Sequence, residues 1–139
     1  MTKTIAKFSN GFKDEYKGAR DVRAAWMITN KATGEVLASG HSLDRANAQK
    51  TADGNVRFVA AALTDHRIVD VPTRSRAYPV EYKRSQIKQA RALSLLDDAP
   101  KGKLSPAQLW GLTCDRLRAY SLEALAAKRA AVNVEVIDI

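Results

Sequence analysis

Apolar and polar residues alternate between positions 22 and 28, and this pattern predicts a β-strand. Val22, Ala24, Trp26 and Ile28 would share one face of the strand, and the residues between them would share the other. A polar loop containing Gly34 follows, and residues 36–39 are expected to return beside the first strand. The two segments are therefore predicted to be antiparallel neighbours.

Three further segments are predicted as strands, and the shortest of them ends at a proline. Residues 4–8 form an apolar run before the turn signal Ser9-Asn10-Gly11. Residues 132–136 alternate like a strand, and residues 68–71 are predicted as a short strand that Pro72 ends. We therefore expect five strands.

Helices are predicted in three places. The first begins with N-cap chemistry at residues 42–44 and runs to about residue 64, with an interruption near Gly54. The second follows Pro79. The third begins at Ser105-Pro106, where serine caps the helix and proline takes its first position, and it reaches about residue 130. The predicted order of elements is βββαβααβ.

Four segments in this order carry a resemblance to the ribonuclease H family. Residues 23–28 resemble the family's tryptophan-containing second strand, and residues 55–63 resemble its Asn-Arg-x-Glu-x-x-Ala helix. Residues 69–78 resemble the end of its fourth strand, and Leu109-Trp110 resembles a Leu-Trp pair in one of its late helices. The resemblance implies an α/β (mixed α+β) ribonuclease H-like fold. Its five-stranded mixed sheet, flanked by helices, would form one domain over residues 1–139.

The same resemblance implies that the catalytic acids are replaced. Asn10 stands where the first-strand aspartate would be, Arg57 near the helix glutamate, and Arg74 at the fourth-strand aspartate. A two-metal mechanism needs clustered carboxylates, and an arginine repels the metal ions. The chain also ends before the last helix, which brings the fourth acid. We therefore expect no catalytic residue, no metal site and no cofactor.

An active nuclease with displaced ligands is the alternative, and it would use Asp14, Asp53 and Asp70.

Composition limits the other chemistries. The 139 residues are 45% hydrophobic and contain one cysteine and two histidines, which leaves no internal disulfide and argues against a zinc site. No segment has the character of a signal peptide or a membrane span, so a cytoplasmic location without a membrane partner is expected. Trp26, Trp110 and Cys114 are predicted in the core, whereas His41 and His66 are predicted at the surface.

The net charge of +8 and the isoelectric point near 9.8 indicate a polyanionic partner. Much of the excess lies between residues 74 and 91, where Glu81 is the only acid. The candidate binding residues are Arg74, Arg76, Lys83, Arg84, Lys88 and Arg91. Arg84, Lys88 and Arg91 are spaced to form one stripe on a helix. The alternative interpretation of the stripe is a solvated helix face.

These observations predict a non-catalytic protein that binds nucleic acid or a nucleic-acid-containing protein complex. Small proteins of this kind resemble the accessory proteins of phages and plasmids, and one such role is inhibition of a host RNA-guided complex, as anti-CRISPR proteins perform. Two alternatives remain open. One is the active nuclease, and the other is a basic module that binds an acidic protein surface.

Overall fold

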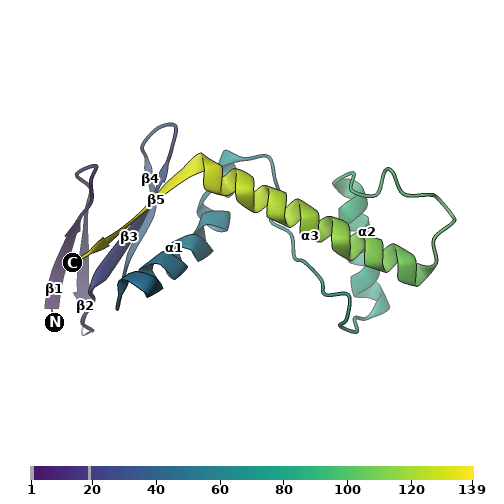
Figure 1. Ribbon diagram of the computed structural model, residues 1–139, viewed down its shortest axis with the longest axis horizontal. Helices are drawn as coiled ribbons and strands as arrows, with labels where there is room; N and C mark the ends of the chain where they lie inside the picture. Colours follow the sequence, from purple (N-terminus) through teal and green to yellow (C-terminus); the bar gives the residue numbers. More distant parts are fainter. Residues whose placement is uncertain (1, 19) are drawn as a thin grey trace. The chain divides into compact units, whose positions relative to one another are not determined.

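The computed structural model describes residues 2–18 and 20–139, which belong to two compact units (Figure 1). The first unit comprises Met1–Arg67 and Leu125–Ile139, and the second comprises Ile68–Ala124. The elements of the first unit are β1 (Thr2–Lys7), β2 (Lys13–Gly18), β3 (Ala24–Asn30), β4 (Val36–Ser42), α1 (Arg45–Val59), a 3-10 turn (Ala61–Leu63) and β5 (Val132–Asp138). The second unit contains α2 (Val80–Ala92) and most of α3 (Pro106–Ala131).

The first unit has three layers, with strand β3 at its centre. β3 pairs antiparallel with β4 on one side and β5 on the other. Trp26 and Ile28 pack in one cluster with α1 residues, whereas Ala25 and Met27 pack in another with Phe8, which directly follows β1. Because both faces of β3 are covered, by α1 and by the β1–β2 hairpin, nearly the whole strand is buried (Figure 1).

The hairpin is also joined to both edge strands of the three-stranded sheet by polar contacts. At β5, the Glu135 carboxylate accepts hydrogen bonds from the backbone N–H and the hydroxyl of Ser9, at 3.1 and 2.8 Å. At β4, Nδ1 of His41 lies 3.4 Å from a carboxylate oxygen of Asp14 on β2. These contacts fix the hairpin over the sheet.

Helix α1 begins where the capping chemistry predicts. Asp44 has extended backbone angles, and its side chain accepts a hydrogen bond from the backbone N–H of Asn47 at 2.8 Å. Gly54 does not interrupt the helix, which ends at Val59. Ala48, Ala52 and Val56 of its inner face are buried.

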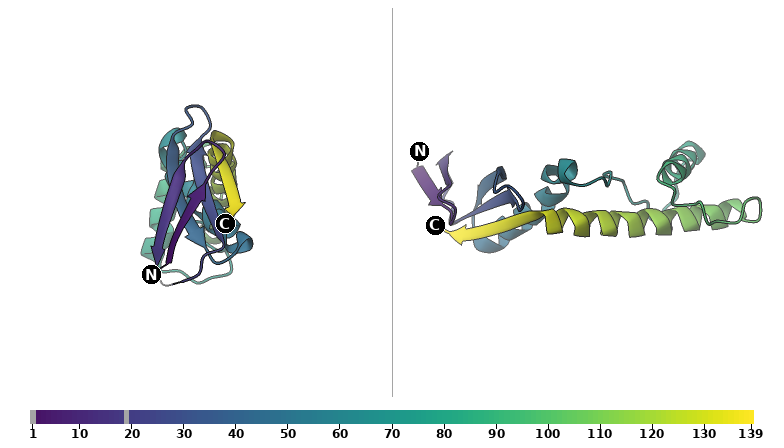
Figure 2. Two further views of the ribbon diagram at one scale, coloured as in Figure 1. Left: turned by 90° about the vertical axis from the view of Figure 1, so that its left-hand side faces the viewer. Right: turned by 90° about the horizontal axis from the view of Figure 1, so that it is seen from above.

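The second unit is built on α2 and α3. Its small core consists of Ala90 of α2, Leu96 of the loop after α2, and Leu117 of α3. The predicted start of α3 is confirmed by a capping box in which Ser105 and Gln108 exchange hydrogen bonds between side chain and backbone. β5 follows the last residue of α3 without a loop, as the right-hand view of Figure 2 shows.

The five-stranded mixed sheet expected from the ribonuclease H resemblance is wrong. The described chain contains a two-stranded and a three-stranded sheet, all pairings are antiparallel, and four strands precede the first helix. Residues 13–18 form an unpredicted strand, whereas residues 68–71 form none. Ile68 and Val71 remain 41% and 37% exposed, because this segment pairs with no strand among the described residues.

Other expectations hold at a coarser level. The antiparallel pairing of segments 22–28 and 36–39 is confirmed, and so is a mixed α+β composition. The single domain over residues 1–139 stays a prediction. Within the described parts of the chain, none of the helices combines the length and the apolar character that crossing a membrane requires.

Candidate functional site

Three of the predicted binding residues form a continuous basic stripe on the outer face of α2. Arg84, Lys88 and Arg91 are exposed, and Gln86 and Ala90 on the opposite face are buried. The spacing of four and three residues places the three cations one above another along the helix. We call them the α2 stripe.

The α2 stripe is not neutralised within its unit. In the part of the chain that the structure describes, none of its three cations has an acidic side chain within 4.0 Å. Glu81 lies one turn before Arg84 on the same helix but forms no ion pair with it among these residues. Three neighbouring cations without partners produce a positive potential that an anion can lower.

The other predicted cations surround an aromatic cluster instead. The rings of Tyr78 and Tyr82 stack with centroids 4.5 Å apart, and the ring of Trp110 meets both at steep angles. The Arg76 guanidinium lies 5.3 Å from the centroid of the Tyr78 ring, and Nζ of Lys83 lies 5.7 Å from that of Trp110. These two cations therefore form cation–π contacts within the protein, which partly offset their charge.

The aromatic cluster attaches the start of α2 to α3. Trp110 is 7% exposed, which confirms its predicted core position. Burial, together with the neighbouring Tyr78, raises the pKa of the Tyr82 hydroxyl above its ordinary value. The three rings therefore provide packing, and the Tyr82 hydroxyl stays neutral at physiological pH.

Arg74 is tied to α3 as well. Its Nη1 lies 3.5 Å from a carboxylate oxygen of Asp115, and a Cβ added to Gly111 would lie 2.8 Å from its Nη2. The guanidinium thus lies against the glycine, and an acid neutralises part of its charge. Arg74 is not at the end of a strand, because the expected strand 68–71 does not form.

The six candidate residues therefore fall into two groups. Lys83 and Arg84 are adjacent in sequence, and about 100° around the helix separates their side chains. Lys83 is half-buried beside Trp110, whereas Arg84 faces solvent. The α2 stripe is the group with unpaired charge, and the group of Arg74, Arg76 and Lys83 is held by α3 and the aromatic cluster.

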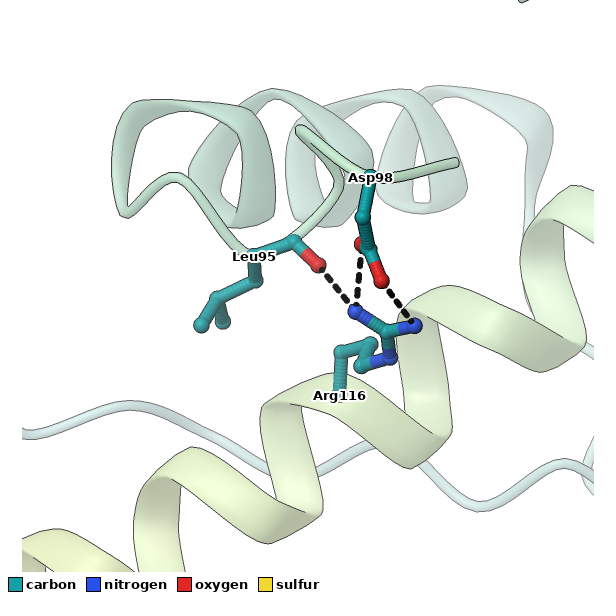
Figure 3. Close-up of polar contacts among 3 residues, drawn as sticks. All are labelled: Leu95, Asp98 and Arg116. Carbon is teal, nitrogen blue, oxygen red and sulfur yellow. Dashed lines mark hydrogen bonds and ion pairs between the residues drawn. The ribbon is translucent and has the colours of Figure 1, made fainter. Parts of the chain in front are cut away.

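The loop after α2 is fixed by Arg116 of α3 (Figure 3). Its guanidinium donates to both carboxylate oxygens of Asp98, at 2.7 and 3.0 Å, and to the carbonyl oxygen of Leu95 at 3.0 Å. The hydrogen bonds between the two side chains lower the pKa of Asp98 and raise the pKa of Arg116. This bidentate pair was not predicted, because its partners lie 18 residues apart in the chain.

A cavity of about 640 Å³ opens beside this loop. The loop residues between Leu96 and Leu104 line much of it, together with Leu109 and with Arg91 of the α2 stripe. The charged residues of its lining are Arg91, Asp97 and Lys101. The α2 stripe therefore borders a partly apolar hollow.

The positions expected to be degenerate catalytic sites have local structural roles. The side chain of Asn10 accepts a hydrogen bond from the Phe12 N–H at 2.9 Å in the turn after β1, where Gly11 has a φ of +86°. The Arg57 guanidinium lies 5.1 Å from the centroid of the Phe58 ring. Neither arrangement requires a catalytic ancestor.

The three aspartates that an active nuclease would use as displaced metal ligands lie apart from one another or contact other side chains. Asp14 contacts His41, and Asp53 accepts a hydrogen bond from Gln49 at 3.0 Å, while Asp70 is exposed. Over residues 2–18 and 20–139, no three or more His, Cys, Asp or Glu side chains are grouped so that they could hold a metal ion.

Two features were missed by the sequence interpretation. The side chain of His41, expected at the surface, is 4% exposed and lies with its ring centroid 5.4 Å from that of Tyr16. The second feature is strand β2, in which exposed Lys13, Glu15 and Lys17 alternate with half-buried residues. The alternation was overlooked because its inward positions are mostly polar.

No family model, curated protein or solved structure matches this chain.

Proposed function

We propose that this protein is a non-catalytic binding protein whose α2 stripe contacts the phosphate backbone of nucleic acid, free or within a nucleoprotein complex. The observation that carries the proposal is the exposure of Arg84, Lys88 and Arg91 on one helix face without acidic partners in the described chain. Cations so placed release condensed counterions when they bind phosphates, and this release drives association.

Charge also indicates which part of a nucleoprotein complex would be bound. In a host RNA-guided complex of the kind that anti-CRISPR proteins inhibit, the stripe would contact a guide or target strand. It would avoid the positively charged protein channel that holds the strands, because like charges repel. An acidic protein surface is the competing partner, and the experiment below separates the two.

The test is replacement of the stripe by Arg84→Gln, Lys88→Gln and Arg91→Gln together. For duplex DNA at about 0.1 M salt, each lost phosphate contact should weaken binding about eightfold, equally for unrelated sequences. Fluorescence anisotropy with duplex DNA, single-stranded RNA and an RNA–DNA hybrid would measure this. The matched control replaces Lys103, Arg118 and Arg129 by glutamine, because these exposed cations lie outside α2 and do not line the cavity beside Arg91.

The control separates a specific surface from net charge. An equal loss of affinity in the stripe and control variants would contradict the proposal, because any three charges would then suffice. A stripe variant that binds all three nucleic acids normally, but associates more slowly with an acidic protein, would assign the stripe to a protein partner instead.

A further inference from the structure

The outward face of the β1–β2 hairpin carries four lysines. Ala6 and the adjoining Phe8 point into the core, so alternate residues of the strands point outward. Lys3, Lys7, Lys13 and Lys17 are all exposed on that outward face. We call these four residues the hairpin lysines.

The strand register places the hairpin lysines directly opposite one another. Lys3 is paired with Lys17, and Lys7 is paired with Lys13. Like charges in direct opposition destabilise an antiparallel pair. The hairpin therefore contains two cross-strand arrangements that folding alone would not favour.

Only one of the two pairs is compensated. Glu15 lies 3.6 Å from Nζ of Lys3 and 3.3 Å from Nζ of Lys17. Lys7 and Lys13 have no acidic side chain within 4.0 Å among the described residues. The uncompensated pair is consequently the stronger site for an external anion.

Solubility alone does not account for this arrangement. Single lysines on exposed strands protect them from pairing with other chains. That protection does not require two lysines to be register partners. Lysines at staggered positions would protect the strands equally well without repelling each other. A polyanion that lies across the face would convert the repulsion into a favourable interaction.

We propose that the outward face of the β1–β2 hairpin is a second binding surface, which contacts the backbone phosphates of double-stranded nucleic acid. A two-stranded ribbon fits the major groove of B-DNA. A ribbon that enters the groove runs along it, and each lysine pair then has one lysine on each strand, on opposite sides of the ribbon. The two lysines of a pair can therefore reach phosphates on opposite sides of the groove.

The centre of the face suits the floor of a groove. Between the lysine pairs lie Ile5, which is 51% exposed although it is a large apolar side chain, and its register partner Glu15, whose carboxylate contacts Lys3 and Lys17. Apolar side chains in the major groove contact the methyl group of thymine. The major groove admits a two-stranded ribbon and offers a contact for the exposed Ile5 side chain, so we assign duplex nucleic acid rather than an acidic protein surface.

The test uses the double substitution Lys7→Gln and Lys13→Gln. Affinity for a 20-base-pair DNA duplex should fall about eightfold per lost contact at 0.1 M salt, and the salt dependence should flatten by roughly 1.8 units of slope. Removal of the repulsion should leave Tm unchanged or raise it by about 1–3 °C. Lys31→Gln with Lys50→Gln, exposed cations of the same unit outside the hairpin, is the matched control.

The two readouts separate the outcomes. Weaker duplex binding with an unchanged or raised Tm supports the proposal, whereas unchanged binding overturns it and makes the lysines a solubility device. If the glutamine variant loses stability, Lys7→Thr with Lys13→Thr replaces it, because threonine removes the charge and is favoured in strands. Binding of polyglutamate as tight as that of the duplex would also overturn the proposal. The stripe variant is measured separately, so failure of one surface does not imply failure of the other.

Discussion

At the residue scale, the position of Trp26 depends on a glycine in the neighbouring strand. Gly40 is the register partner of Trp26, and an added Cβ would lie 2.7 Å from Nε1 of the indole. Trp26 is 6% exposed and belongs to the cluster beneath α1. The ring therefore uses the space that any larger residue at position 40 would occupy.

Gly40→Ala should accordingly destabilise the protein by about 1–3 kcal/mol, because the added methyl group overpacks a closed part of the core. Chemical denaturation measures this free energy of unfolding. Gly54→Ala is the control, since nothing lies within 4 Å of its Cβ position in α1. It should stabilise by about 0.5–1 kcal/mol, and a Gly40→Ala variant as stable as the wild type would show that the ring lies elsewhere.

Single residues were predictable where their neighbours in sequence determine their environment. Trp26 and Trp110 occur in apolar periodic segments, and both are buried as expected. The burial of His41 was not predictable, because it depends on Asp14 and Tyr16 of a strand far earlier in the chain. Contacts between distant segments leave no local signal.

At the element scale, the apolar pattern failed to predict strand β2 and wrongly predicted a strand at residues 68–71. β2 forms with mostly polar residues, because β1 supplies its backbone partner and the sheet supplies a surface for its inner face. Residues 68–71 are apolar enough for a strand, but no described strand is beside them. Strand formation requires a partner, and the local sequence does not identify one.

The loop after α2 gives a prediction on pH. Because hydrogen bonds from Arg116 lower the pKa of Asp98 in the folded protein, the carboxylate stabilises the fold above its unfolded pKa of about 4. That contribution is lost as the pH falls through the lower folded pKa.

Asp98→Asn should therefore lower Tm at pH 7, and the deficit should become smaller as the pH falls below about 4, with a modest effect because the pair is exposed. Thermal unfolding at pH 7, 5 and 3 would measure it, with Asp97→Asn as the control beside it. An Asp98→Asn deficit that persists unchanged at pH 3 would show that the charge of Asp98 does not stabilise the loop.

At the scale of the whole molecule, the chain contains two units with separate cores, and α3 belongs to both. Residues 106–124 of this helix lie in the second unit, and residues 125–131 lie in the first. A helix is cooperative along its length. We therefore expect the units to unfold together, in agreement with the single domain predicted from chain length.

Trp26→Ala and Trp110→Ala test this coupling, because each removes a large ring from a different unit. Each should cost about 3–5 kcal/mol and lower the temperature of one shared transition. Scanning calorimetry would detect it. Two resolved transitions, of which each variant shifts only one, would show that the units fold independently.

The candidate site was predictable only in part at this scale. Helical periodicity correctly placed Arg84, Lys88 and Arg91 on one exposed face. It did not separate them from Arg74, Arg76 and Lys83, because the contacts with Asp115 and the aromatic cluster join segments far apart in the sequence. The hairpin lysines were missed together with β2.

The central claim is that unpaired surface cations bind nucleic-acid phosphates, and the salt dependence of wild-type affinity for a short DNA duplex tests it most directly. Three phosphate contacts from the α2 stripe predict that log K falls against log salt with a slope of about −2.7, and the hairpin lysines would make the slope steeper. A slope near zero, or no measurable binding at 50 mM salt, would contradict the account.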